Sequence, residues 1–240
     1  MDRKKDSEIL AKRSLEIQRG GARAAVLGVN DGLVSTLCLV LGVAGAGAAS
    51  HSVLLAGFAG VIAGAVSMAA GEWISVRSQV ELFSGVLADI NRLIVGGDRP
   101  LLRDQISESL AKTGHKQATA EKAANEIAAD DTHLAGTYAR QVMGFNPDEL
   151  GSPWVAAISS FVLFSLGALA PLGPWLFTGG MSAILMSIVF TAIGGLIVGG
   201  YISKSSGKNV WHGALRQLGI VVLASVVTYG IGYLFGTTVS

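Results

Sequence analysis

The sequence predicts an all-α integral membrane protein with five transmembrane helices and a small cytosolic helical domain between the second and third of them. Half of the 240 residues are hydrophobic and only 15% are charged, whereas soluble domains average about 25% charged residues. Five apolar stretches are each long enough to cross a hydrocarbon core about 30 Å thick. They cover residues 24–46, 52–76, 153–175, 179–202 and 212–235.

Composition also excludes several classes of protein. The formal net charge is +1, which favours neither a nucleic-acid-binding surface nor an acidic solvating chain. The single cysteine, Cys38, lies in an apolar stretch, so we expect neither a disulfide framework nor a cysteine zinc site. The first 21 residues are charged rather than apolar, and we expect no cleaved signal peptide.

The segment 1–21 alternates charged residues with Ile9, Leu10, Leu15 and Ile17. This pattern predicts a cytosolic amphipathic helix that lies against the membrane surface. A solvated tail is the alternative.

The distribution of basic residues predicts the topology. All 18 lysines and arginines lie within residues 1–23, 77–140 and 204–216, and none lies in the other two linkers or in the tail. With five spans, every basic residue then falls on one side. The positive-inside rule places the amino terminus in the cytosol and the carboxyl terminus outside, and we expect a bacterial inner membrane. The chain divides into residues 22–77 with spans one and two, 78–150 as the cytosolic domain, and 151–240 with the last three spans.

The cytosolic domain shows helical periodicity of its apolar residues. The turn-forming segments Gly96–Pro100 and Thr113–His115 divide it into about three helices.

Asp31 sets a carboxylate inside the first predicted span, where it is the only charged residue between positions 24 and 46. A charge in hydrocarbon costs on the order of 2.5–3.5 kcal/mol on the most lenient insertion scale, and such residues mark ion or proton paths. The alternative is that Asp31 caps a broken helix or pairs with a backbone group, because Gly28 and Gly32 would allow a local kink.

Met68 and Glu72 lie four residues apart in the second span and therefore share a helix face. Counted from Arg23 and Arg77 at about 1.5 Å per residue, Asp31 and Met68 lie at nearly the same depth. Carboxylate oxygens with a thioether suit Fe²⁺ or Mn²⁺, or a softer late transition metal, better than Mg²⁺ or Ca²⁺. The alternative for Met68 is core filler, the commoner role of methionine. Other polar or polarizable residues are candidates for lining the path: Asn30, Ser35, Cys38 and Ser67.

Three segments carry motifs that extend these observations: Gly28–Thr36 (GVNDGLVST), Gly64–Gln79 (GAVSMAAGEWISVRSQ) and Phe164–Pro174 (FSLGALAPLGP). Together they resemble the vacuolar iron transporter family, from about residue 19 to the end. The resemblance implies a homodimer of five-span subunits that moves Fe²⁺, sometimes Mn²⁺, out of the cytosol in exchange for protons, through a path between the subunits. It matches Asp31 and Met68 to the family's membrane-site aspartate and methionine, and Glu72 to its bacterial-type pattern. The metal is cargo, so no cofactor is expected.

The sequence departs from that family at several positions. The plant members' second membrane aspartate, membrane glutamate and third-span tyrosine would fall at Ala24, Gly60 and Phe164. The glutamates that gather metal in the cytosolic domain would fall at Ile90, Leu93, Leu101, Asp104 and Val142, of which one is acidic. The acids that could still gather metal there are Asp104, Glu108, Asp130 and Asp131, although such residues usually form a solvated face. Without metal storage, the domain would hold the dimer together through an apolar stripe of Leu82, Val86, Ile90 and Leu93.

The sequence is compatible with three functions. The favoured one is a metal/proton antiporter that uses Asp31, Met68 and Glu72. The alternative is a non-transporting dimeric membrane scaffold or receptor whose cytosolic helices bind a partner. An enzyme is least favoured, because the four histidines are scattered and no catalytic spacing occurs.

Overall fold

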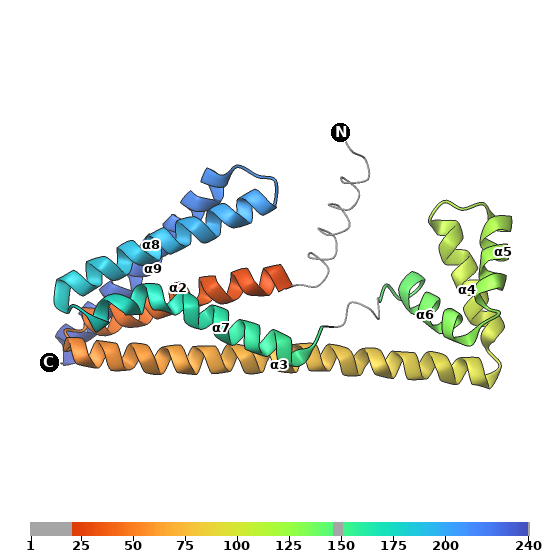
Figure 1. Cartoon of the computed structure of the whole chain (residues 1–240), viewed down its shortest axis with the longest axis horizontal. Helices are drawn as coiled ribbons and strands as arrows, with labels where there is room; N and C mark the ends of the chain where they lie inside the picture. Colours follow the sequence, from red (N-terminus) through yellow and green to blue (C-terminus); the bar gives the residue numbers. More distant parts are fainter. Residues whose placement is uncertain (1–20, 146–150, 240) are drawn as a thin grey trace. The chain divides into compact units, whose positions relative to one another are not determined.

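A computed structural model describes residues 21–145 and 151–239 of the chain, so the predicted amphipathic segment lies almost wholly outside the described residues. Every element in the described part is helical (Figure 1). Five helices there are long and apolar enough to cross a membrane, which confirms the predicted fold class. The elements are α2 (Gly21–Gly45), α3 (Ser50–Gly96), α4 (Arg99–Lys112), α5 (Gln117–Ile127), α6 (Asp131–Gln141), α7 (Pro153–Leu172), η2 (Gly173–Leu176), α8 (Gly180–Ser205) and α9 (Val210–Val239).

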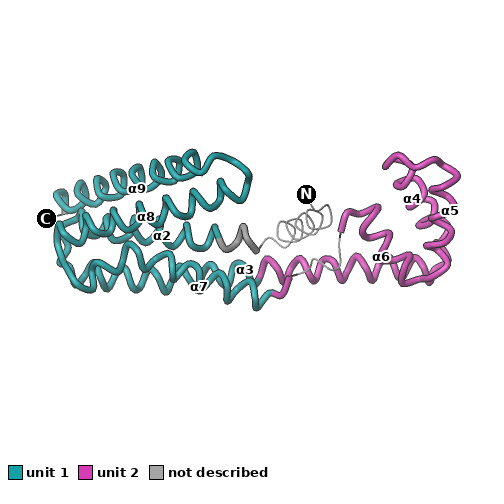
Figure 2. The backbone as a smooth tube through the Cα atoms, turned by 45° about the horizontal axis from the view of Figure 1, so that its top comes forward, with its two compact units in different colours: residues 1–73, 153–240 teal, residues 74–152 magenta. Residues whose placement is uncertain are grey.

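The chain forms two compact units (Figure 2). The membrane unit contains α2, α3 up to Trp73, and α7 to α9, and the inter-span unit comprises residues 74–152. We predicted domain boundaries after residues 77 and 150, a few residues from these divisions. Helix α3 continues from one unit into the other without a break. Between Gly71 and Gly96, Gly85 is the one residue that strongly disfavours a helix, and a single glycine is tolerated inside one.

Helix α2 is the centre of the membrane unit, where it packs against α7, α8 and α9. Its side chains Leu37, Val40 and Leu41 are fully buried and form a cluster with residues from α3, α7, α8 and α9. The membrane part of α3 contacts α2 and α7 where side chains of those two helices lie over glycines of α3. A Cβ atom added at Gly60 would lie 2.1 Å from Leu39 Cδ2, and one added at Gly64 would lie 2.4 Å from Phe164 Cζ.

The contact between α2 and α7 is made by backbone against backbone. A Cβ atom added at Gly32 would lie 2.1 Å from the carbonyl oxygen of Phe164, and one added at Gly167 would lie 2.2 Å from that of Val29. Small residues permit such an approach between membrane helices. A side chain at Gly32 would force α2 and α7 apart. The close contact therefore determines which side of α2 faces α7.

The inter-span unit has its own apolar core. Helix α3 contributes Ile90 and Ile94, α4 contributes Leu102 and Ile106, and α6 contributes Leu134. The predicted break points are confirmed by Gly97 and Gly114, which have φ angles of +96° and +102°, a conformation that favours glycine.

The predicted apolar stripe of α3 is corrected by this core. Ile90 is 3% exposed and Val86 packs against the same cluster, so both belong to the interior of the unit and are not available to a partner. Leu82 and Leu93 do lie outside, at 72% and 39% exposed. The two groups separate because a helix turns about 100° per residue, which carries residues 86 and 90 towards α4 and α6 and leaves 82 and 93 on the outer side.

Candidate metal site in the membrane unit

Asp31 lies on the outer side of α2, within the candidate span Val26–Gly45. Its neighbours along the chain are directed elsewhere. Gly32 meets the backbone of α7, and the amide oxygen of Asn30 accepts a hydrogen bond from Gln217 in α9. Each neighbour lies about 100° around the helix from Asp31. The carboxylate therefore points into the remaining sector, where it is exposed on the single chain.

The alternative role for Asp31, as the cap of a broken helix, does not hold. Helix α2 is continuous from Gly21 to Gly45, so Asp31 lies mid-helix. The hydroxyl of Ser35 donates to the backbone carbonyl of Asp31 and leaves the carboxylate uninvolved. Among the described residues, none donates a hydrogen bond to that carboxylate.

Met68 and Glu72 lie on α3 and are half-buried. Met68 packs against the cluster of Ala65, Phe164 and Ala168. Phe164 also connects the helices, because its carbonyl faces Gly32 of α2 and its ring covers Gly64 of α3. Asp31 precedes Gly32 by one residue and Met68 follows Gly64 by one turn, so both lie near the level of Phe164, although only Met68 packs against it.

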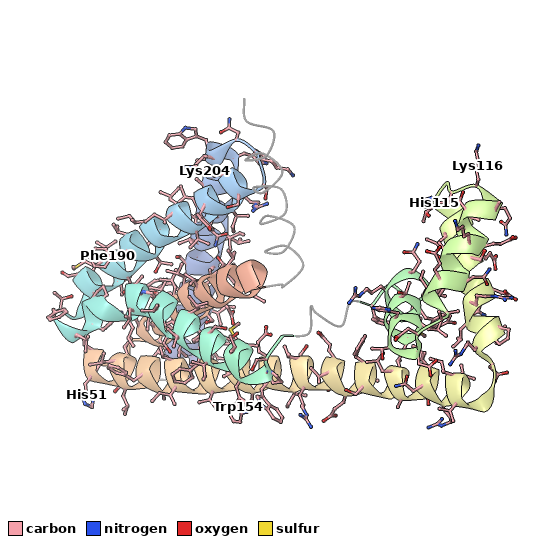
Figure 3. The ribbon with its side chains drawn as sticks, turned by 45° about the vertical axis from the view of Figure 1, so that its right-hand side comes forward. His51, His115, Lys116, Trp154, Phe190 and Lys204 are labelled. Atoms are coloured by element: carbon pink, nitrogen blue, oxygen red, sulfur yellow. The ribbon has the colours of Figure 1, made fainter. Side chains whose placement is uncertain are left out.

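Glu72 lies next to an aromatic pair at one end of the membrane unit. The rings of Trp73 and Trp154 meet edge to face, with centroids 5.9 Å apart, and Figure 3 labels Trp154 at the start of α7. Tryptophan is enriched where a membrane meets water. Glu72 is therefore the candidate ligand nearest the membrane surface.

The other candidate path residues differ in direction. Ser35 and Ser67 are exposed on α2 and α3. Cys38 is half-buried, and its thiol lies beside the Thr228 side chain of α9. Asn30 is held by Gln217. Ser35 thus extends the outward face of Asp31, whereas Cys38 and Asn30 point towards α9.

Sequence reasoning missed Gln217, which lies 187 positions from its partner Asn30. A signal was available, because Gln217 is a polar amide inside the fifth apolar stretch. Asp31 was identified because a polar group within the hydrocarbon region must find a partner inside the protein. The same rule applies to Gln217.

The candidate metal-gathering acids of the inter-span unit have partners within the protein. Asp104 pairs with Arg103 at 2.5 Å, Glu108 pairs with Lys112 at 2.7 Å, and Asp131 pairs with Arg99. Asp104 and Glu108 line a groove of about 380 Å³ with Glu121, between α4 and α5, whereas Asp130 and Asp131 begin α6. Within the described ranges, no cluster of three or more acids, histidines or cysteines has the geometry to hold a metal ion.

Two of these acids have lowered pKa values. The hydrogen bond from Lys112 lowers the pKa of Glu108, and the backbone N–H of His133 lowers the pKa of Asp130, which caps α6. A lowered pKa means that each contact stabilises the fold above the ordinary pKa and is lost as the pH falls through the lowered value. At neutral pH the Asp130 carboxylate caps α6, whereas Glu108 forms an exposed ion pair that contributes little to stability.

A multi-pass α-helical membrane protein with an outward-facing acid in a central span is the class that the fold and this site define. The chain matches the VIT family over residues 22–233. It is 31% identical over 238 residues to "Vacuolar iron transporter homolog 3" of Arabidopsis thaliana, covering 99% of this chain and 93% of that protein. It is 32% identical over 215 residues to "Vacuolar iron transporter homolog 1" of Oryza sativa subsp. japonica (89% and 73% covered), and 30% identical over 187 residues to "VIT-like transporter 1a" of Glycine max (78% and 71% covered).

The chain belongs to the VIT family. It is therefore a membrane transporter and not an enzyme, and the alternative of a non-transporting scaffold loses its support.

Proposed function

We propose that this protein moves Fe²⁺, and also Mn²⁺, out of the cytosol in exchange for protons, through a path between the two subunits of a homodimer. The observation that carries the proposal is the exposed carboxylate of Asp31 on the central membrane helix. The names of the relatives support iron as the cargo.

A second copy of the chain is part of the proposal because Asp31 faces outward. Facing lipid, a carboxylate would carry the full cost of a charge in hydrocarbon. Facing a second copy, two such carboxylates would border a shared polar path. Ser67 and Gly71 are small and exposed on α3, which would allow close approach of another helix.

The ligand set suits these cations. Asp31 and Glu72 supply hard oxygen donors and Met68 a soft thioether, and this combination favours Fe²⁺ and Mn²⁺ over Mg²⁺ and Ca²⁺, which prefer oxygen alone. The ion would enter beside Glu72, near the membrane surface, and move to the level of Asp31 and Met68.

Exchange with protons would follow from competition for one site. A bound divalent cation requires ionised carboxylates, whereas protons that arrive from the outer side neutralise them and release the metal. The same carboxylates then carry protons inward as metal leaves. This direction requires the topology that the basic residues predict, with the amino terminus and the inter-span unit in the cytosol. That the membrane is a bacterial inner membrane stays a prediction from the sequence.

The proposal is tested with purified protein in liposomes offered Fe²⁺, Mn²⁺, Co²⁺ and Zn²⁺ from the cytosolic face. We expect uptake of Fe²⁺ and Mn²⁺ that protein-free liposomes do not show. Absence of uptake for every one of these metals would contradict the proposal.

Met68→Leu separates the ligand role of Met68 from core filling. The change conserves volume, so stability should change by less than about 1.5 kcal/mol. Because the sulfur is lost, the uptake ratio of Co²⁺ to Mn²⁺ should fall. Met186→Leu, at a methionine of α8 that lies 36% exposed, is the matched control. An unchanged metal profile in Met68→Leu would assign this residue to the core.

Changing the inter-span acids should have little effect. With Asp104, Glu108, Asp130 and Asp131 replaced by Asn or Gln, we expect initial uptake rates within a few-fold of the wild type, because exposed carboxylates attract cations only weakly through screening solvent. Asparagine also keeps the cap of α6. A collapse of uptake with the unit still folded would mean that it gathers metal through a rearranged set of acids.

A further inference from the structure

Gln217 of α9 makes a side-chain hydrogen bond to α2 directly beside Asp31. Among the described residues, no other side-chain hydrogen bond joins two membrane spans at this position. The Nε2 of Gln217 donates to Oδ1 of Asn30, one residue before Asp31. Gln217 is 5% exposed and lies in the candidate span Val210–Thr238. Away from water, an amide must find its partner within the protein. The pair therefore ties α9 to the turn of α2 that carries the candidate metal ligand.

The glycine face of α8 holds Gln217 in place. A Cβ atom added at Gly199 would lie 2.9 Å from Gln217 Cβ, and one added at Gly195 would lie 3.1 Å from its Cγ. The stem of Gln217 therefore lies directly on the backbone of α8. With its stem confined, the amide can reach Asn30 in few orientations.

The tie to Asn30 fixes how α2 is rotated about its own axis. Contact with α7 at Gly32 fixes one side of the helix, and the bond to Asn30 fixes the other side. Because these positions lie about 100° to either side of residue 31, the two anchors together direct Asp31 outward. Contact at Gly32 is steric and would permit the helix to roll away from α7, whereas the hydrogen bond to Gln217 opposes that roll.

We propose that Gln217 is a positioning residue for metal transport, which fixes the direction of the Asp31 carboxylate through its hydrogen bond to Asn30. This inference rests on the proposed function. Gln217 is directed at Asn30 and has no place among the metal ligands, so its effect on transport would be indirect.

Transport kinetics give the first test. Gln217→Leu removes the hydrogen bond and keeps a side chain of similar size, and we expect kcat/KM for Fe²⁺ uptake in liposomes to fall by at least about tenfold, since small misplacements of a binding group are costly. The exchange variant Asn30→Gln/Gln217→Asn keeps the same number of atoms between the helices and should restore most of the loss. Ser225→Ala is the matched control in α9, because the Ser225 hydroxyl donates to the carbonyl of Val221 in its own helix, and it should behave as the wild type.

A second readout needs no transport. A spin label is attached to the thiol introduced by Asp31→Cys in a Cys38→Ser background, and its collision rates with a water-soluble nickel chelate and with oxygen are compared by electron paramagnetic resonance. We expect Gln217→Leu to change the ratio of the two rates, and the exchange variant to bring it back.

The outcomes separate the two claims. If wild-type protein transports Fe²⁺ while Gln217→Leu keeps its kcat/KM and its collision ratio, the positioning role is overturned and the proposed function stands. If Gln217→Leu yields less folded protein but leaves both readouts unchanged in the folded fraction, Gln217 is structural only, which also overturns the proposal. If wild-type protein moves no metal, the proposed function fails, and with it the role of Gln217 in transport.

Discussion

Asp31→Asn is expected to abolish metal uptake while the protein stays folded. The amide keeps the shape of the side chain but removes the charge that offsets the cost of stripping water from a divalent cation. We expect the initial rate of Fe²⁺ uptake in liposomes to fall at least about 100-fold, which corresponds to about 2.7 kcal/mol. Removing a charge from a membrane helix should not reduce the thermal stability of the protein, and could raise it.

Glu81→Gln is the control for this substitution. Glu81 is an exposed acid that pairs with Arg77 on the inter-span part of α3, and its neutralisation should leave uptake unchanged. Wild-type uptake by Asp31→Asn would remove Asp31 from the path. Loss of uptake together with loss of the fold would mean that the carboxylate has a structural role.

Ile90→Asp is expected to unfold the inter-span unit. Ile90 is 3% exposed within a core that α3, α4, α5 and α6 share. The substitution loses the packing of a buried isoleucine, about 2–5 kcal/mol, and in addition buries a carboxylate without a partner. Hydrogen exchange of the full-length protein should show protection lost throughout residues 74–141 and retained in the spans.

Leu82→Asp on the same helix is the matched control. Leu82 is 72% exposed, so the unit should keep its stability to within about 0.5 kcal/mol. If this part of α3 contacts a second copy, Leu82→Asp should weaken association in detergent, measured by light scattering, without loss of protection. Normal protection in Ile90→Asp would contradict the core described above.

The sequence predicts the ends of the membrane spans better than it predicts the ends of the helices. Apolar length located all five spans, because the membrane requires it, and Gly97 and Gly114 marked two turns with positive φ. The continuity of α3 was missed because polarity changes near Arg77 while helix propensity does not. Loss of hydrophobicity shows where a chain leaves the membrane, and it does not show where a helix ends. The turn at 128–130 was missed too, although Asp130 has the composition of a helix cap.

The candidate site was predictable only in part, because local sequence signals do not show which distant segments meet. Asp31 and Met68 could be found from local signals, namely a charge in an apolar stretch and an equal depth. The partner of Asn30 could not, because Gln217 comes from a helix 187 positions away and its approach depends on glycines in α8. The stripe of Leu82, Val86, Ile90 and Leu93 was misjudged because periodicity identifies a shared face without showing which part of it the other helices cover.

Simultaneous measurement of metal and proton movement tests the central claim most directly. Liposomes that contain the protein, a metal-sensitive dye and a pH-sensitive dye are given Fe²⁺ on the cytosolic face with an acidic lumen. We predict that metal entry and lumen alkalinisation occur together, that collapse of the pH gradient by an ionophore slows metal entry, and that Asp31→Asn abolishes both signals. Metal entry that proceeds at the same rate without a pH gradient and moves no protons would contradict exchange at Asp31.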